Sequence, residues 1–277
     1  MNLNPPVAMT IAGSDSGGGA GIQADLKTFA ALGVFGTSAI TALTAQNTVG
    51  VRAVHAVPAS FLLAQVEAVL DDLPVAAVKT GMLATTENVY VVAELAGAGR
   101  LPRLVVDPVM VASSGDRLLE PAAERLYVSK LLPHAMVITP NLREAEVLLG
   151  QPIRTLADQR NAATALGALG PPTVIVKGGH AVADTPAEAV DVLWHNGALR
   201  ELRAPRIDTV NNHGSGCSFA SAITAYLAQG EPIDAAVELA KAFIWRAVTG
   251  GAHWTLGAGH GPLDHFAWTH PTLSRQP

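Results

Sequence analysis

The sequence has one cysteine, few aromatic residues and little charge: Cys217 is alone in 277 residues, and charged residues make up 15%. A single cysteine excludes an internal disulfide, so we expect a reducing, cytoplasmic location. No apolar run approaches the roughly 20 residues that span a bilayer, and residues 1–6 lack the charged and apolar regions of an export signal. We therefore expect no membrane partner.

Positive charge is also scarce. There are 18 Lys and Arg against 23 Asp and Glu, which gives a net charge of −5. A basic surface is the usual mark of nucleic-acid binding, so we expect no nucleic-acid partner and a small-molecule substrate instead. Hydrophobic residues form 49% of the chain, enough to build a large core, and this excludes a mainly disordered chain.

Short apolar runs rich in Val and Ile alternate with longer helical patterns along the chain. This alternation predicts an α/β fold with buried parallel strands. No linker or repeat divides it, so we expect one domain over residues 1–277, with a hairpin at 191–195 and 198–203 around Asn196-Gly197. The other predicted strands are 7–12, 37–44, 75–79, 104–107, 136–139 and 173–177, and the helices are 22–32, 60–73, 86–96, 121–132, 142–149 and 156–169.

The segment from Asn211 to Cys217 combines a glycine-containing turn with the start of an apolar helical pattern. Gly214 and Gly216 allow the N–H groups around Ser215 to converge, and the helix dipole adds positive potential. A glycine-rich loop that only caps a helix would explain the glycines equally well. Cys217 favours a functional site, because a thiol in the first turn of a helix is expected to have a lowered pKa.

A second glycine-rich loop, residues 13–21, follows the first predicted strand. It lacks the lysine of a P-loop and the third glycine of the dinucleotide-binding motif. We therefore expect its main chain to approach a ligand closely, with Asp25 and Gln46 as nearby polar groups. Asp25 on a solvated surface helix is an equally good reading of the sequence.

Polar residues also follow the later strands, at the sheet edge where parallel α/β proteins bind ligands. Asn141 and Glu144 are three residues apart, which suits water-mediated Mg²⁺ binding, although Glu144 could equally be a charge placed at a helix start. Lys177 could neutralise a phosphate, and Asp107 is either a metal ligand or part of an Asp-Pro turn.

Several motifs resemble those of the bacterial hydroxymethylpyrimidine/phosphomethylpyrimidine kinases, in the same order and over nearly the whole chain. They cover residues 12–15, 18–27, 41–48, 79–83, 107–110, 139–144, 177–180, 213–217, 257–262 and 265–266.

This resemblance implies a ribokinase-like three-layer α/β/α sandwich with a mostly parallel central sheet. It implies an enzyme that uses MgATP to phosphorylate 4-amino-5-hydroxymethyl-2-methylpyrimidine (hydroxymethylpyrimidine below) and then its monophosphate, which supplies the pyrimidine half of thiamine. A monovalent cation is an optional further ligand. A homodimer paired through residues 191–203 is also expected.

The resemblance also assigns residues to roles. Gln46 would read the aminopyrimidine edge, in a pocket formed by Asp25, Gly13, Ala20, Met82 and Val109. Lys177, Asn141 and Ser215 would bind ATP. Mg²⁺ and its waters would be arranged by Glu144, Asn141 and Asp107. The main-chain amides of Gly214, Ser215, Gly216 and Cys217 would hold the transferring phosphoryl group.

Cys217 stands where the wider superfamily usually has an aspartate base, so we predict a partial loss of activity when it is removed. A pyridoxal kinase shares the fold and the cysteine-bearing loop, and Gln46 favours the pyrimidine instead. A sugar kinase is disfavoured because Cys217 is not an aspartate. A non-catalytic pyrimidine-binding regulator is disfavoured by the intact Asn141, Glu144 and Lys177.

Overall fold

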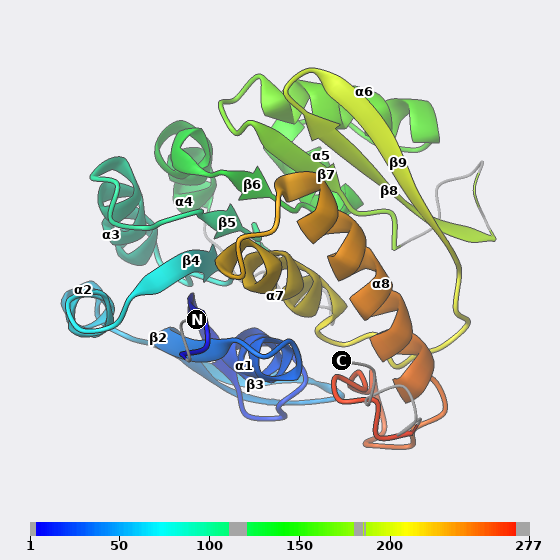
Figure 1. Cartoon of the computed structure of the whole chain (residues 1–277), viewed down its shortest axis with the longest axis horizontal. Coiled ribbons are helices and arrows are strands. Elements are labelled where there is room, and N and C mark those ends of the chain that lie inside the picture. Colours follow the sequence, from blue (N-terminus) through cyan, green and yellow to red (C-terminus); the bar gives the residue numbers. More distant parts are fainter. Residues whose placement is uncertain (1–3, 111–120, 180–184, 186, 270–277) are drawn as a thin grey trace.

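A single mixed sheet runs through the computed structural model, which describes residues 4–110, 121–179, 185 and 187–269 (Figure 1). The order of its described strands is β3-β2-β1-β4-β5-β6-β7-β8-β9. The six central strands, in the sheet order β2-β1-β4-β5-β6-β7, pair in parallel. The outer strands pair antiparallel: β3 with β2, β8 with β7 and β9 with β8. The strands are β1 (Val7–Asp15), β2 (Phe35–Asn47), β3 (Gly50–Ala56), β4 (Val75–Thr80), β5 (Val105–Val106), β6 (Val137–Ile138), β7 (Thr173–Val176), β8 (Glu188–His195) and β9 (Ala198–Pro205).

Helices cover both faces of the sheet and complete three layers, as predicted. The α1, α7 and α8 helices pack on one face and α2 to α6 on the other. The helices are α1 (Gly21–Ala31), α2 (Ala59–Leu70), α3 (Thr86–Gly97), α4 (Pro121–Leu126), α5 (Leu142–Leu149), α6 (Leu156–Gly167), α7 (Ser215–Ala228) and α8 (Ile233–Gly251).

Two hydrophobic cores, one on each face, explain why the strands read as continuous apolar runs. In β4, Ala77 faces the core under α1, α7 and α8, and its neighbour Val78 faces the core under α2 to α6. Val105 and Val106 of β5 divide in the same way. Successive strand side chains point to opposite faces, so a strand covered on both sides must be apolar at every position.

The predicted hairpin is confirmed as β8 and β9, and its turn has positive φ at both Asn196 and Gly197, as the tight turn requires. The segment predicted as a helix, 121–132, is helical throughout, but it is not one regular α-helix. The α-helix ends at Leu126 and continues as a π-helical turn to Leu131 and a 3₁₀ turn over Leu132–His134. Pro133 has no N–H for the α-helical bond, so the regular ladder cannot continue there.

Strand β3 was not predicted, and β2 extends to Asn47, beyond the predicted end at residue 44. Most of β3 is exposed and its apolar residues do not alternate with polar ones, so the sequence carries no strand pattern there. Gln46 is half-buried and lies next to the turn of the β2–β3 hairpin. The C-terminal segment contacts the turn between β2 and β3, because the His260 N–H donates to the Thr48 carbonyl oxygen (3.0 Å).

The connections change direction between β1 and β4. The chain passes from β1 to β2 and β3 on one side and then returns to β4 on the other side of β1. Ligands of open α/β sheets bind at such a reversal, outside the carboxyl ends of the strands. The ends of β1, β4, β5, β6 and β7 therefore define where the site should lie.

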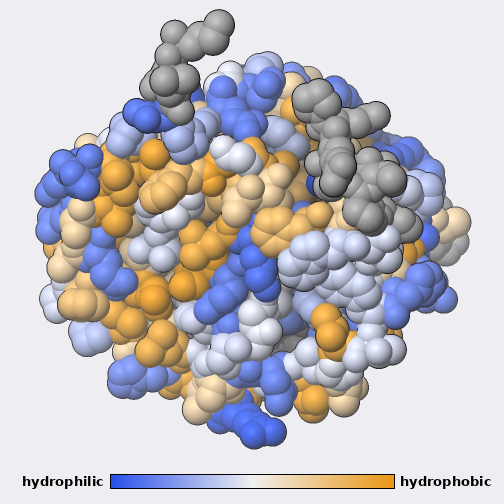
Figure 2. Space-filling view, turned by 60° about the horizontal axis from the view of Figure 1, so that its bottom comes forward, coloured by the Kyte–Doolittle hydropathy of each residue, from blue (hydrophilic) through white to orange (hydrophobic). Residues whose placement is uncertain are grey.

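Some large apolar side chains are exposed on β2, β3 and α2, namely Phe35, Leu43, Val54 and Phe61. In the view of Figure 2, apolar side chains are most numerous in the left half of the surface. Among the described residues, no helix combines the length and the apolar character needed to cross a membrane.

Candidate functional site

The N-terminus of α7 lies at this edge of the sheet and has the geometry of an anion site. Gly214 has φ +82°, and a Cβ there would lie 1.8 Å from the Gly19 carbonyl oxygen, so only glycine fits. The Ser215 N–H donates to the Asn212 carbonyl, whereas the N–H groups of Gly216 and Cys217 have no acceptor among the described residues. Free amides at a helix N-terminus suit a phosphate oxygen.

Lys177 and Asp107 lie beside these amides. The Lys177 Nζ donates to Asp107 Oδ1 (2.8 Å), and a Cβ on Gly216 would come within 3.2 Å of the same nitrogen. Burial by itself lowers the pKa of Lys177, but the carboxylates of Asp107 and Glu144 raise it above its ordinary value. The structure therefore brings three predicted site residues, Lys177, Asp107 and Gly216, to one point around a buried positive charge.

Asn141 and Glu144 form a capping box at the start of α5. The Glu144 N–H donates to Asn141 Oδ1 (2.9 Å), and the Asn141 N–H donates to Glu144 Oε2 (2.7 Å). The helix-start interpretation of Glu144 is thus confirmed, and a metal role stays a prediction. Burial raises the pKa of Glu144 from 4.5 to about 7; Lys177 opposes this shift and Asp107 adds to it.

The donor set fits a magnesium ion held largely through water. Asp107 Oδ2 and Glu144 Oε1 have no hydrogen-bond donor among the described residues, although both side chains are buried. The described residues contain no group of three or more His, Cys, Asp or Glu side chains arranged around a metal position. Two carboxylates with waters and phosphate oxygens are a usual environment for Mg²⁺.

The lowered pKa predicted for the Cys217 thiol is wrong. Burial raises its pKa to about 11, and the carboxylates of Asp25 and Asp107 add to the shift. The Lys79 ammonium and the Gly21 N–H act in the other direction without overcoming it. The thiol is therefore neutral near pH 7.

Behind Cys217 lies an ion pair between Lys79 and Asp25, and both side chains are fully buried (2.9 Å). Asp25 also accepts hydrogen bonds from Thr10 Oγ1 (2.6 Å) and Ser221 Oγ (2.7 Å). The surface-helix interpretation of Asp25 is therefore wrong. Its oxygens are engaged inside the protein, and its role in framing a substrate pocket stays a prediction.

Lys79 was missed as a site residue. Burial lowers its pKa, but the charge and hydrogen bond of Asp25 and the charge of Asp107 raise it by more, so it is held as a cation. Its only sequence signal is a lysine inside the apolar run that forms β4.

Gly13 and Met82 lie against each other at the ends of β1 and β4. A Cβ on Gly13 would be 2.4 Å from Met82 Cε, so the missing side chain makes room for the methionine. Ala20 is the N-cap residue of α1 and donates its N–H to Asp15 Oδ2 (2.9 Å). Val109 is half-buried two residues after Asp107, at the same sheet edge.

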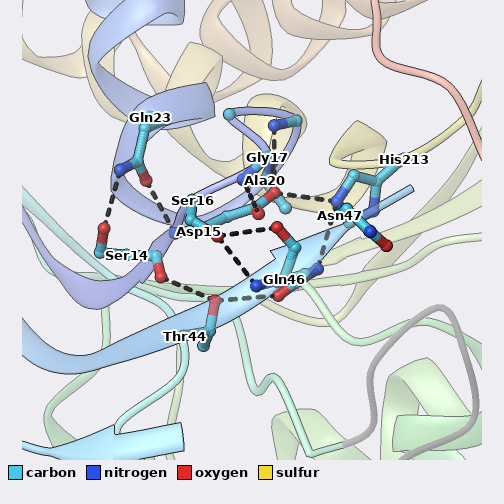
Figure 3. A network of polar contacts seen from close by, with 12 residues as sticks. Ser14, Asp15, Ser16, Gly17, Ala20, Gln23, Thr44, Gln46, Asn47 and His213 are labelled. Carbon is cyan, nitrogen blue, oxygen red and sulfur yellow. Dashed lines mark hydrogen bonds and ion pairs between the residues drawn. The ribbon is translucent and has the colours of Figure 1, made fainter. Parts of the chain in front are cut away.

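Gln46 belongs to a polar network centred on Asp15 (Figure 3). Asp15 accepts hydrogen bonds from the N–H groups of Gly17 (2.8 Å), Gly19 (3.0 Å) and Ala20, and lies 3.0 Å from His213 Nε2. Burial raises the pKa of Asp15, but these partners lower it by more, so the carboxylate is ionised. His213 in turn lies beside the Gln46 amide (3.3 Å).

Asp15 and His213 were also missed as individual site residues. Each stands in a motif, Asp15 inside the glycine loop and His213 directly before Gly214. Nothing in the sequence indicates that these two residues, 198 positions apart, are in contact.

The sequence family described as "Phosphomethylpyrimidine kinase" matches residues 15–264. A hydroxymethylpyrimidine/phosphomethylpyrimidine kinase of Rhizobium meliloti is 49% identical over 94% of this chain and 97% of its own length. One of Haemophilus influenzae is 47% identical over 96% of this chain and 98% of its own. The chain spans about half (52%) of a similar bifunctional thiamine biosynthesis protein of Geobacter sulfurreducens, at 47% identity over 93% of this chain.

Two solved structures show related arrangements. The pyridoxal kinase of Staphylococcus aureus in complex with AMP-PCP and pyridoxal is 37% identical, with a TM-score of 0.85 over 96% of this chain and 95% of that one. A phosphomethylpyrimidine kinase of Clostridium difficile is 44% identical, with a TM-score of 0.75 over 86% of this chain and 97% of that one.

The raised pKa of Glu144 makes stability depend on pH. A carboxyl group whose pKa is higher in the folded than in the unfolded protein stabilises the folded state. This contribution is fully present below about pH 4.5 and is lost as pH rises through about 7. Glu144→Gln keeps the capping acceptor but cannot ionise. We expect the unfolding free energy of this variant, minus that of wild type, to rise by on the order of 3 kcal/mol between pH 4.5 and pH 8.

Urea unfolding at a series of pH values, without added metal, measures this difference. Glu87→Gln is the matched control, since Glu87 is an exposed glutamate in the first turn of α3. Parallel stability curves for wild type and Glu144→Gln would contradict the prediction.

Proposed function

Because this chain belongs to the phosphomethylpyrimidine kinase family, we propose that it phosphorylates hydroxymethylpyrimidine with MgATP and then phosphorylates the resulting monophosphate. The product would supply the pyrimidine half of thiamine. The observation that carries the proposal is the meeting of the free α7 amides with the Lys177–Asp107 pair at one sheet edge. This arrangement fits phosphoryl transfer, which depends mainly on positioning and charge stabilisation.

Different residues would bind the transferring phosphoryl group, the other ATP phosphates and the metal ion. The N–H groups of Gly216 and Cys217 would bind the transferring phosphoryl oxygens, and the Lys177 ammonium would neutralise charge on the ATP phosphates. Asp107 and Glu144 would hold Mg²⁺ and its waters. When bound, the ion supplies positive charge that compensates the phosphates.

The hydroxyl group need not lose its proton to a thiolate. Cys217 is a neutral thiol near pH 7, because burial raises its pKa to about 11. A loose transition state needs little help from a base, and the nucleophile of the second phosphorylation is already an anionic phosphate. Cys217 would then contribute mainly its N–H group and its contact with the substrate.

The main alternative is a pyridoxal kinase. Pyridoxal kinases of Staphylococcus aureus and Bacillus subtilis share this fold at 37–38% identity, with TM-scores of 0.85–0.87. Gln46, which offers both a donor and an acceptor, favours an aminopyrimidine. We also propose a single kinase domain in the cytoplasm, on the grounds of the continuous sheet and the lone cysteine.

A substrate panel tests the proposal. We expect ADP release with MgATP and either hydroxymethylpyrimidine or its monophosphate, and at least about tenfold lower kcat/KM with pyridoxal or ribose. Parallel assays with and without potassium check the optional monovalent cation. Preference for pyridoxal would favour the alternative, whereas tight pyrimidine binding without ADP release would indicate a non-catalytic regulator.

Replacement of the thiol tests its role. Cys217→Ala keeps the main-chain N–H, so we expect a partial loss of kcat, below about 100-fold, smaller than a general base typically contributes. Cys217→Ser serves as the matched control of similar size, and circular dichroism checks the fold of both. A well-folded Cys217→Ala protein at the background rate would instead establish an essential base.

We further propose a homodimer. The β9 edge expected to pair carries the charged cluster of Arg203, Glu201 and Glu188, which makes it a poor dimer contact. Leu43 of β2 and Val54 of β3 are exposed apolar side chains on opposite faces of the β2–β3 hairpin, and they make this edge of the sheet the better surface for a second copy.

Light scattering at several protein concentrations tests the dimer. We expect a dimer for wild type and for Leu199→Glu at the β9 edge, and a shift to monomer for Leu43→Glu. A monomeric wild type would reject the dimer. Loss of the dimer only in Leu199→Glu would show that the dimer interface lies at the β9 edge.

A further inference from the structure

We propose that Asp15 and His213 fix the direction of the Gln46 side-chain amide, with Oε1 toward His213 and Nε2 toward Thr44, and that this direction decides how a substrate is oriented. The statement about the amide rests on hydrogen-bond chemistry alone. The statement about the substrate rests on the proposed function. Asp15 and His213 would act as positioning residues through Gln46.

The contact between His213 and Asp15 determines where one hydrogen lies. His213 Nε2 is 3.0 Å from Asp15 Oδ2, and an ionised carboxylate can only accept a hydrogen bond. Nε2 must therefore carry a hydrogen. A ring nitrogen that carries a hydrogen cannot accept another one, yet it lies 3.3 Å from Gln46 Nε2, which can only donate.

The other end of the amide has a conflict of a different kind. Thr44 Oγ1 has one hydrogen and lies 2.9 Å from the Ser14 carbonyl oxygen and 3.2 Å from Gln46 Oε1. Both oxygens only accept, so one hydroxyl hydrogen would have to serve both.

A half-turn of the Gln46 amide removes the contact between two donors at His213 and the shared hydroxyl hydrogen at Thr44. Oε1 then accepts from His213 Nε2–H, a hydrogen that it shares with Asp15 Oδ2, and Nε2 donates to Thr44 Oγ1, whose own hydrogen goes to the Ser14 carbonyl oxygen. The two ends of an amide have nearly the same shape, so the hydrogen-bond network decides which way it points. Two contacts on opposite sides of the amide give the same answer.

The surroundings hold this network in place. Three main-chain amides fix the Asp15 carboxylate, and Gly19 leaves room for the imidazole, since a Cβ there would be 2.3 Å from His213 Cδ2. Ser16 Oγ bonds both the N–H (2.8 Å) and the carbonyl (2.7 Å) of Gln46. The direction of the amide is therefore fixed before any ligand arrives.

This direction matters for catalysis because His213 directly precedes the anion site at Gly214. On the pyrimidine ring, the amino group lies between the hydroxymethyl carbon and a ring nitrogen. A substrate amino group bonded to Oε1 would lie on the His213 side of the amide, and its neighbouring hydroxymethyl group would lie on the same side, where Gly214 follows His213. The opposite amide direction would turn the ring over and place the hydroxymethyl group on the Thr44 side.

The first test reads the hydrogen on His213 without using activity. Two-bond ¹H–¹⁵N spectra of ¹⁵N-histidine protein, with His213 assigned by its absence in His213→Gln, identify which ring nitrogen is protonated. We expect Nε2 to carry a hydrogen from pH 6 to pH 9. A neutral ring protonated only at Nδ1 would overturn the proposal.

The second test compares two variants on two pyrimidines, hydroxymethylpyrimidine and the analogue without the amino group. His213→Leu removes the donor, and we expect it to raise KM for hydroxymethylpyrimidine about tenfold, to reduce the preference for the amino compound similarly, and to change KM for ATP less than about twofold. His213→Gln keeps N–H donors and should restore most of the preference.

His260→Leu is the matched control, because His260 lies within hydrogen-bond distance of the same loop at Val210 and Asn212 and has no hydrogen bond to Gln46 among the described residues. It should keep the wild-type preference. An unchanged preference in His213→Leu, or equal effects on both substrates and ATP, would overturn the proposal. Absence of turnover with hydroxymethylpyrimidine in wild type would reject the proposed function, while the spectra would still decide the direction of the amide.

Discussion

The buried ion pair of Lys79 and Asp25 fixes the geometry on which the site depends. Lys79 comes from β4 and Asp25 from α1, and the same carboxylate bonds Thr10 of β1 and Ser221 of α7. Separating either charge from its partner would leave a bare charge in the interior, which is strongly unfavourable. The four elements that meet where the sheet connections reverse are therefore held in one arrangement. Because Ser221 lies one turn after Cys217, the pair also sets the position of the α7 N-terminus.

The charges under the anion site do not balance. Three buried carboxylates, Asp25, Asp107 and Glu144, face two lysines, Lys79 and Lys177. The surplus negative charge helps to raise the pKa values of Glu144 and Cys217. A magnesium ion would relieve that surplus and would also let ATP phosphates approach the carboxylates. The charge arrangement thus supports the binding of metal and nucleotide together.

Periodicity predicted the elements whose burial is regular, and the strand ends then placed Asp107, Asn141 and Lys177 at one edge. It could not find β3, because an exposed edge strand has no apolar alternation. Asp25 and Cys217 show another limit. Whether a carboxylate is solvated or paired, and whether a thiol is acidic, depends on neighbours such as Lys79 and Asp107 that are distant in the sequence. The direction of the Gln46 amide depends in the same way on Ser14, Asp15, Thr44 and His213.

The glycine-rich loop after β1 uses main-chain amides for its own hydrogen bonds. Its amides at Gly17, Gly19 and Ala20 donate to the loop's own Asp15, so they are not available to a phosphate. Their bonds hold the carboxylate that orients His213, and Gly19 supplies the space for the ring. We propose that phosphate binds instead at the amides of α7, where Gly214 lies against the same loop. Two glycine-containing segments that look alike in the sequence would therefore have different tasks, one on the substrate side and one on the phosphate side.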